Sequence, residues 1–166
     1  NQGDSVETIE LPEGSQPADM AFDEDNDVMW VSDRTGRVIA VPLSGGEPQV
    51  TETGGDSNPE GIAVLDGSAW VALTGVGQVA RIPIDGGKTE SIDVGGMPRG
   101  LIADDDTGRD LIWVANGDGY VSKISPDDPQ SPTTFDVPGS PEEVAAGPVK
   151  IWVTSGEGNE LNSIMP

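Results

Sequence analysis

The sequence predicts an all-β fold, a β-propeller of four blades with four antiparallel strands in each. A short phrase of an apolar residue, Trp and Val recurs along the chain, and the intervals between its tryptophans are 40, 43 and 39 residues. Glycine (23) and proline (14) are spread evenly, and no stretch keeps a helical period. A repeat of about 40 residues with short apolar strands between turns is typical of propeller blades. The phrase contains every tryptophan of the chain: Trp30, Trp70, Trp113 and Trp152.

Each repeat divides into the same four predicted strands. The first strand opens at a proline, and the second carries Trp-Val and is apolar on both faces, which indicates burial on both sides. The third strand is apolar, as in residues 79–84, and the fourth is polar, as in residues 89–94. A polar fourth strand suits the exposed edge of a sheet. The opening prolines are Pro17, Pro59, Pro98 and Pro141.

The two ends of the chain complement each other in this scheme. Residues 6–11 have the pattern of a fourth strand, whereas the last repeat ends after its third strand. We expect residues 6–11 to pair with the last repeat and to close a ring of about sixteen strands with neighbouring termini. The alternatives are a fragment of a larger ring, or two chains that share one ring. The single predicted domain, 1–166, contains repeats at about 6–46, 47–87, 88–130 and 131–166.

Composition excludes several classes of site. With 30 acidic and 8 basic residues the net charge is −22, a field that repels nucleic acid and anionic membranes and favours basic partners. Histidine and cysteine are absent, which excludes Ser–His and Cys–His nucleophiles and thiolate zinc sites. No apolar run is long enough to insert into a membrane. The chain starts at Asn1, so we interpret it as a processed or excised part of a larger protein, and we expect a monomer.

Residues 91–101, followed by residues 111–116, resemble the YVTN/NHL class of propeller repeat. That class has a polar strand, a Gly and a Pro, an x-Gly-apolar step, and then an aromatic residue before Val-x-Asn/Asp. Residues 58–63 with 69–71 match the same pattern. The resemblance covers essentially the whole chain and implies the propeller fold. It does not select one function, because such repeats occur in binding, sensing and enzymatic proteins.

Two groups of propellers share this repeat style. The extracytoplasmic propellers of some actinobacterial receptor Ser/Thr kinases resemble the chain, which implies a sensor domain outside the cytoplasm or a secreted one; a cytoplasmic location stays open. Streptogramin lyases resemble it more distantly. They have more blades and use a catalytic His with magnesium, so no catalytic residue transfers to a chain without His. Gluconolactonase-type propellers hold a divalent metal with carboxylates and Asn, and the sequence offers no complete set.

Candidate ligand contacts lie in the loops expected at one face of the ring, around its axis. The residue pairs after the opening prolines should lie nearest this mouth: Ala18-Asp19, Glu60-Gly61, Arg99-Gly100 and Glu142-Glu143. A mouth that mixes cations and carboxylates suits a small ligand or a peptide, particularly a basic one. The alternative is a set of turns without a ligand. The predicted contacts are Arg34, Glu60, Arg99, Asn116, Tyr120 and Glu142.

Two acidic turns are candidate calcium or magnesium sites because their ligands would all be oxygen atoms. They contain Asp23, Asp25 and Asp27 in one turn, and Asp104 and Asp106 in the equivalent turn two repeats later. The first turn departs from a calcium-binding EF-hand loop, since Val28 replaces the required glycine. The simplest interpretation of both is a solvated hairpin turn.

The hypothesis that follows is a non-catalytic binding or sensor propeller, without a cofactor and without assigned catalytic residues. One alternative is a metal-assisted lyase or lactonase-type enzyme, for which Glu60 and Glu142 would be the acid/base pair. Another is a structural scaffold for protein–protein interaction. The four tryptophans are interpreted as packing between blades, and the alternative is an aromatic cage for a ligand.

Overall fold

The computed structural model describes residues 6–104 and 110–165, which form strands and turns without a helix. Fifteen strands make four antiparallel sheets, and in each sheet the strands follow their order in the chain. The all-β propeller architecture predicted from the sequence is therefore confirmed. No helix with the length and apolarity needed to cross a bilayer occurs in these residues.

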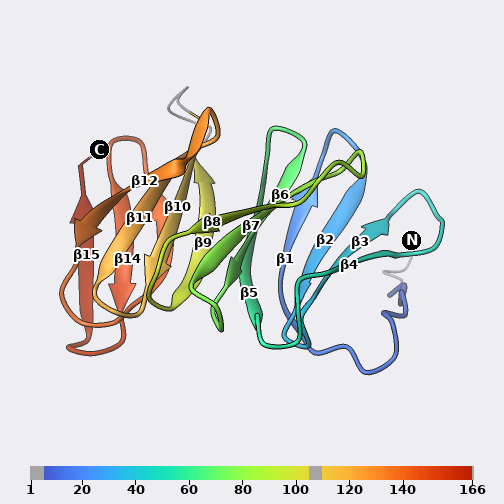
Figure 1. The fold of residues 1–166 in the computed structure, drawn as a ribbon, viewed down its shortest axis with the longest axis horizontal. Helices are drawn as coiled ribbons and strands as arrows, with labels where there is room; N and C mark the ends of the chain where they lie inside the picture. Colours follow the sequence, from blue (N-terminus) through green and yellow to red (C-terminus); the bar gives the residue numbers. More distant parts are fainter. Residues whose placement is uncertain (1–5, 105–109, 166) are drawn as a thin grey trace, which may run out of the picture.

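The sheets stack face to face along the long axis of the molecule, as Figure 1 shows. The first sheet contains β1 (Pro17–Asp23), β2 (Val28–Asp33), β3 (Arg37–Pro42) and β4 (Gln49–Glu52). The second contains β5 (Pro59–Leu65), β6 (Ser68–Leu73), β7 (Gln78–Pro83) and β8 (Glu90–Asp93). The third contains β9 (Pro98–Asp104), β10 (Leu111–Asn116), β11 (Tyr120–Ser125) and β12 (Asp128–Asp136). The last contains β13 (Pro141–Ala146), β14 (Ile151–Ser155) and β15 (Glu160–Ile164).

Hairpin turns are set by residues that accept a left-handed backbone. Leu65 pairs with Ser68, which leaves Asp66-Gly67 as a two-residue loop between β5 and β6. Both loop residues have positive φ, 50° and 61°. Asp-Gly is a preferred sequence for this turn, because its twist matches that of the flanking strands.

The tryptophans hold consecutive sheets together. Trp30 packs in a cluster with Ile62 and Val71 of the second sheet. Trp70 does the same with Ile112 and Val114 of the third sheet, and Trp113 with Ile151 and Val153 of the last. These three indoles are buried, whereas Trp152 is 40% exposed. Each Trp therefore lies on the sheet face that meets the following sheet, and only the last one has no following sheet in the described residues.

The inner strands lie side by side in the order β1, β5, β9, β13. Two side-chain hydroxyls tie neighbouring sheets together at this edge. The Ser32 hydroxyl contacts the Glu60 carbonyl, and the Thr74 hydroxyl donates to the Pro98 carbonyl at 2.6 Å. The starts of β5 and β9 are thus each fixed against the preceding sheet.

The expected ring closure is not present. Residues 6–11 form no strand, and the last sheet has three strands in the described part of the chain. The first and last sheets lie at opposite ends of the stack (Figure 1), so the expectation of neighbouring termini is also wrong. The physical reason is local: Leu11 packs on Val31, Ile39 and Val41 of the first sheet. Hydrogen bonds anchor the linker after it, which keeps residues 6–11 beside the first sheet.

The buried Asp33 carboxylate is the anchor of that linker. It accepts hydrogen bonds from the Gln16 amide at 3.0 Å and from the Thr35 amide at 2.9 Å, and it pairs with Arg37 at 2.8 Å. Burial raises the pKa of Asp33, but the hydrogen bonds from Thr35, Gln16 and Ser15 outweigh burial and lower the pKa to about 2. The carboxylate is thus held in its charged form.

Trp113→Ala tests the packing between sheets. Trp113 is fully buried and contacts Phe135, with 5.6 Å between ring centroids. We expect its removal to lower the free energy of unfolding by about 3–5 kcal/mol, because a large cavity is left in a well-packed core. Denaturant titration measures the loss, and Val149→Ala, at an exposed side chain, is the control. Equal small losses in both variants would contradict this role.

Asp33→Asn tests the anchor by pH. Since the folded pKa is depressed, the carboxylate stabilises the fold fully above its ordinary pKa of 3.8, and this contribution is lost as the pH falls towards 2. The shift corresponds to about 2 kcal/mol. We expect the Asn variant to be less stable at neutral pH and to lose less stability between pH 4 and pH 2. Urea titrations at several pH values measure this, with Asp25→Asn, an exposed carboxylate, as the control.

Candidate functional site

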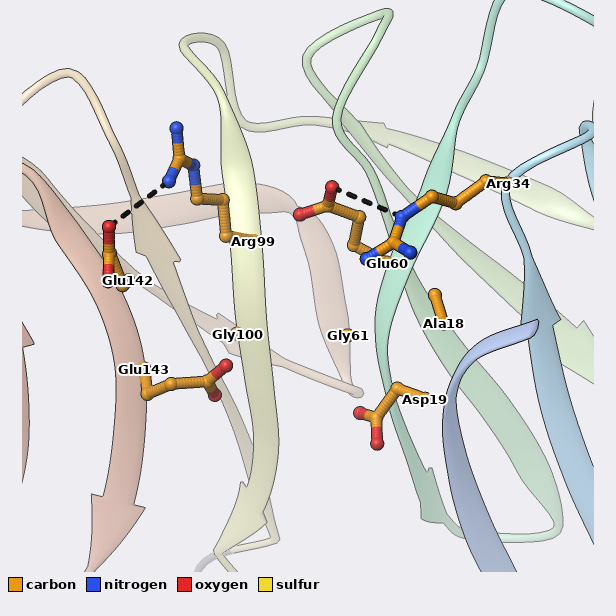
Figure 2. Close-up of a pocket in the computed structure, with 9 residues that line it drawn as sticks. All are labelled: Ala18, Asp19, Arg34, Glu60, Gly61, Arg99, Gly100, Glu142 and Glu143. Carbon is orange, nitrogen blue, oxygen red and sulfur yellow. Dashed lines mark hydrogen bonds and ion pairs between the residues drawn. The ribbon is translucent and has the colours of Figure 1, made fainter. Parts of the chain in front are cut away.

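A cavity of about 340 Å³ opens where the four inner strands begin. Figure 2 shows its lining side chains converging from β1, β5, β9 and β13, together with one residue that follows β2. Each inner strand contributes the first two residues after its opening proline. The lining residues are Ala18, Asp19, Arg34, Glu60, Gly61, Arg99, Gly100, Glu142 and Glu143.

Backbone irregularities direct these residues into the cavity. The pairing of every inner strand with its neighbour shifts register just after the proline, for example between Pro17 and Asp19 and between Pro141 and Glu143. Such a bulge bends the strand and changes the direction of its side chains. Polar residues can therefore face the cavity in strands whose other side chains alternate between buried and exposed positions.

Two ion pairs cross between neighbouring sheets at the cavity. Arg34 Nε lies 3.7 Å from Glu60 Oε1, and Arg99 Nη1 lies 3.4 Å from Glu142 Oε1, as the dashed lines in Figure 2 show. All four side chains are partly exposed to solvent. Exposed pairs of this kind contribute at most about 1 kcal/mol each. Their charges are consequently available to a ligand at little cost to the fold.

The other two carboxylates of the cavity have no cationic partner among residues 6–104 and 110–165. Backbone amides of Met20 and Ile62 donate to Asp19 at 2.8 and 3.2 Å, which fixes its carboxylate across the gap between β1 and β5. Glu143 makes no ion pair within the described residues. Partial burial raises its pKa, and the charges of Asp19, Glu142 and Glu60 raise it further. Four carboxylates face two guanidinium groups, so the cavity has an excess of negative charge.

Two glycines let the inner strands approach closely beneath the carboxylates. A Cβ at Gly61 would overlap the Arg99 carbonyl, and a Cβ at Gly100 would overlap the Glu142 carbonyl and the Glu143 carboxylate. The absence of a side chain at Gly100 thus leaves room for Glu143 to lie across β9.

The structure brings four of the six predicted contacts together: Arg34, Glu60, Arg99 and Glu142. Asn116 is buried inside the third sheet, where its amide donates to the Ser122 hydroxyl at 3.0 Å. Tyr120 donates to the Val94 carbonyl at 2.9 Å and packs over Gly96. Neither lines this cavity. Asp19 and Glu143, placed near the mouth by the proline spacing, were not singled out as contacts, although the equivalent positions in each repeat pointed to them.

The acidic turns lie at the other ends of the inner strands. Asp23 is buried and accepts hydrogen bonds from the Asn26 amide and side chain at 3.2 and 3.0 Å, which is the role of a turn cap. Asp25 and Asp27 are exposed, Asp104 is buried at the end of β9, and Asp106 lies outside the described residues. In residues 6–104 and 110–165, no group of three or more acidic side chains is placed to share a metal ion.

Solved structures with the same fold include lyases, a designed protein and a protein complex. A catalytically inactive virginiamycin B lyase from Staphylococcus aureus, solved with quinupristin, matches 93% of the chain with a TM-score of 0.76 and 18% identity. The computationally designed Ika4 protein matches 97% with a TM-score of 0.75 and 12% identity. BBS1N, solved in complex with ARL6DN, matches 84% with a TM-score of 0.69 and 14% identity. The similarity to streptogramin-lyase propellers noted in the sequence is thus confirmed for the fold.

These identities are low and establish only the fold. The chain covers 57% of the lyase, 98% of Ika4 and 47% of BBS1N. It therefore spans little more than half the length of the lyase. No model of a known protein family and no curated protein matches the sequence.

Gly100→Ala tests the close packing under Glu143. We expect a loss of about 1–3 kcal/mol in the free energy of unfolding, because the new methyl group must displace backbone of β13. Gly55→Ala is the matched control, since no atom lies within 4 Å of the added Cβ and its φ is not positive. Thermal or urea unfolding measures both variants. If both variants kept wild-type stability, the strands would not be as close as described.

Proposed function

We propose that this chain is a non-catalytic binding domain whose cavity recognises a cationic group, such as the ammonium of a small ligand or of a lysine side chain in a peptide. The observation that supports it most is a pair of carboxylates, Asp19 and Glu143, that lie on opposite sides of one cavity and have no cationic partner in the described part of the chain. Burial raises the pKa of Glu143 most and repulsion from the neighbouring carboxylates raises it further, and a cation between Asp19 and Glu143 would relieve that repulsion.

The neighbouring ion pairs fit the same role. Arg34 and Arg99 hold Glu60 and Glu142 at the rim, so that the acidic side chains present oriented oxygen atoms. A charge-assisted hydrogen bond to a carboxylate is about twice as strong as one between neutral groups. The net charge of −22 would in addition attract cations over a distance of about one Debye length, roughly 8 Å in physiological salt.

The repeat style of the chain also bears on its biological setting. The repeat style shared with receptor-kinase propellers favours a sensor domain outside the cytoplasm, attached to a larger bacterial protein. A scaffold for another protein is the second candidate. BBS1N, a neighbour in fold, was solved with a protein partner, and the chain exposes apolar faces at both ends of its stack. The lyase or lactonase alternative requires metal-dependent turnover, which a Mg²⁺ titration with an activity assay would detect.

Glu143→Gln is the direct test of cation recognition. The probe is N-acetyl-lysine methylamide, followed by NMR chemical shifts, with the neutral norleucine analogue as the comparison. We expect the lysine probe to shift amides at the starts of β1, β9 and β13, and the variant to bind it about tenfold more weakly, since a charged hydrogen bond contributes about 1.5–3 kcal/mol. Shifts spread over the whole surface, or equal shifts with both probes, would contradict the proposal.

Glu47→Gln is the control, because it removes the same charge from an exposed loop away from the cavity. Binding should also depend on pH in a defined direction. Since the pKa of Glu143 is raised, its carboxylate is lost at a higher pH than that of an ordinary Glu, and affinity should fall correspondingly early on acidification. This early fall should be absent in the Glu143→Gln variant and present in the Glu47→Gln variant.

A further inference from the structure

The outer face of the last sheet carries the kind of side chains that pack between sheets elsewhere in the molecule. No further sheet of the described residues packs against this face. Trp152 is 40% exposed and Leu161 is 66% exposed. Their counterparts in the third sheet, Trp113 and Val121, are fully buried against the last sheet. The sequence therefore continues the internal packing pattern on a face that no further sheet of the described residues covers.

The outer face of the first sheet is the complementary half of the same contact. Met20 is 66% exposed and Phe22 is 45% exposed. The residues equivalent to Met20 in the three following sheets are buried, and each packs in the cluster of the preceding Trp: Ile62 with Trp30, Leu101 with Trp70, and Val144 with Trp113.

Residues 6–11 carry the sequence of a fourth strand. Thr8-Ile9-Glu10-Leu11 aligns with Ser91-Ile92-Asp93-Val94, which overlaps β8, and with Thr134-Phe135-Asp136-Val137 at the end of β12. Ile92 is fully buried in the cluster between the second and third sheets, whereas Ile9 is 47% exposed. Leu11 already packs on the outer face of the first sheet. The segment thus lies where the fourth strand of a preceding sheet would lie.

We propose that two copies of this chain associate head to tail and close one propeller ring, to which each copy contributes four sheets. The three-stranded last sheet of one copy docks on the outer face of the first sheet of the other, with Trp152 against Met20. Residues 6–11 of the second copy pair with β15 and complete the last sheet. Since Val79 pairs with Ile92, and Val121 with Phe135, the equivalent register places Leu161 opposite Ile9.

A second copy is the partner that fits both faces at once. One chain carries both halves of the contact, and the same contact already occurs three times inside it. A head-to-tail interface closes into a ring when its rotation allows, and closure by two copies leaves no apolar end face. Pairing between two copies also gives residues 6–11 the strand partner that the sequence predicts within one chain. A dimer then replaces the expected monomer. It is independent of cation binding in the cavity.

The charge of the chain predicts an unusual salt dependence. Two molecules of net charge −22 repel each other, while the docking faces are apolar. Salt screens the repulsion and leaves apolar burial intact, so association should strengthen as NaCl is raised. An interface held by ion pairs would weaken instead.

Sedimentation velocity of residues 1–166 in low and high NaCl tests the proposal. We expect a species of twice 17.2 kDa that is favoured by salt. Trp152→Asp should raise the dissociation constant by about 30-fold or more, as expected for a central interface residue. Val76→Asp adds the same charge at a comparably exposed apolar residue of the second sheet and should leave the dimer intact. A monomer at every salt and protein concentration, or an open series of larger polymers, overturns the proposal.

Disulfide trapping tests the register without relying on the Trp152 variant. The chain has no cysteine, so Ile9→Cys and Leu161→Cys can be made in separate molecules and mixed under mild oxidation. We expect a covalent dimer of one molecule of each kind. Val76→Cys mixed with Leu161→Cys is the matched control, since Val76 is as exposed as Ile9 and lies in the turn between β6 and β7, away from both end faces. Equal trapping in the control, or none with Ile9→Cys, overturns the proposed register.

Discussion

The contact between the Trp of one sheet and the facing side of the next sheet is the interaction on which the rest of the structure depends. Trp30, Trp70 and Trp113 each fill the space between consecutive sheets, and their burial fixes the order of the stack. Because every sheet meets its neighbour through the same contact, the four inner strands lie in equivalent positions, side by side along one edge of the stack. The cavity exists only because these strands are held there. The two end faces of the stack are open because the end sheets carry the same packing pattern as the inner sheets.

The chemistry of the cavity follows from that arrangement. Equivalent positions after four prolines, remote in sequence, converge on one volume, and the side chains that the sequence places there decide its character. Two of the positions are glycine, which allows close approach of the strands, one is Ala18, and the others supply four carboxylates and Arg99. The fold would accept many other residues at these positions, since exposed ion pairs stabilise it little. Function can therefore change at the cavity without loss of the stack.

The sequence was sufficient for the sheet order, the packing of three of the four tryptophans between sheets and four of the residues that line the cavity, because these depend on local alternation and on a regular repeat. It could not place Asn116 and Tyr120, because their polar, loop-like sequence context does not indicate that they form hydrogen bonds to Ser122 and to the Val94 carbonyl. Nor could it decide where residues 6–11 pair. Their pattern suits a fourth strand in the same molecule or in another one, and the anchoring of Gln16 by Asp33 excludes the first arrangement here. No pattern in the sequence indicates the bulges that direct Asp19 and Glu143 into the cavity.

Hydrogen–deuterium exchange over a range of protein concentrations measures most directly whether a sheet needs a neighbour on its Trp face. In dilute solution and low salt, amides of β14 and β15 should exchange much faster than those of β10 and β11, because the third sheet is covered on both faces and the last sheet on one. Raising the protein concentration should slow exchange in β14 and β15 and leave β10 and β11 unchanged. Equal protection of both sheets in dilute solution would contradict the account, since the last sheet would then be stable without a neighbour.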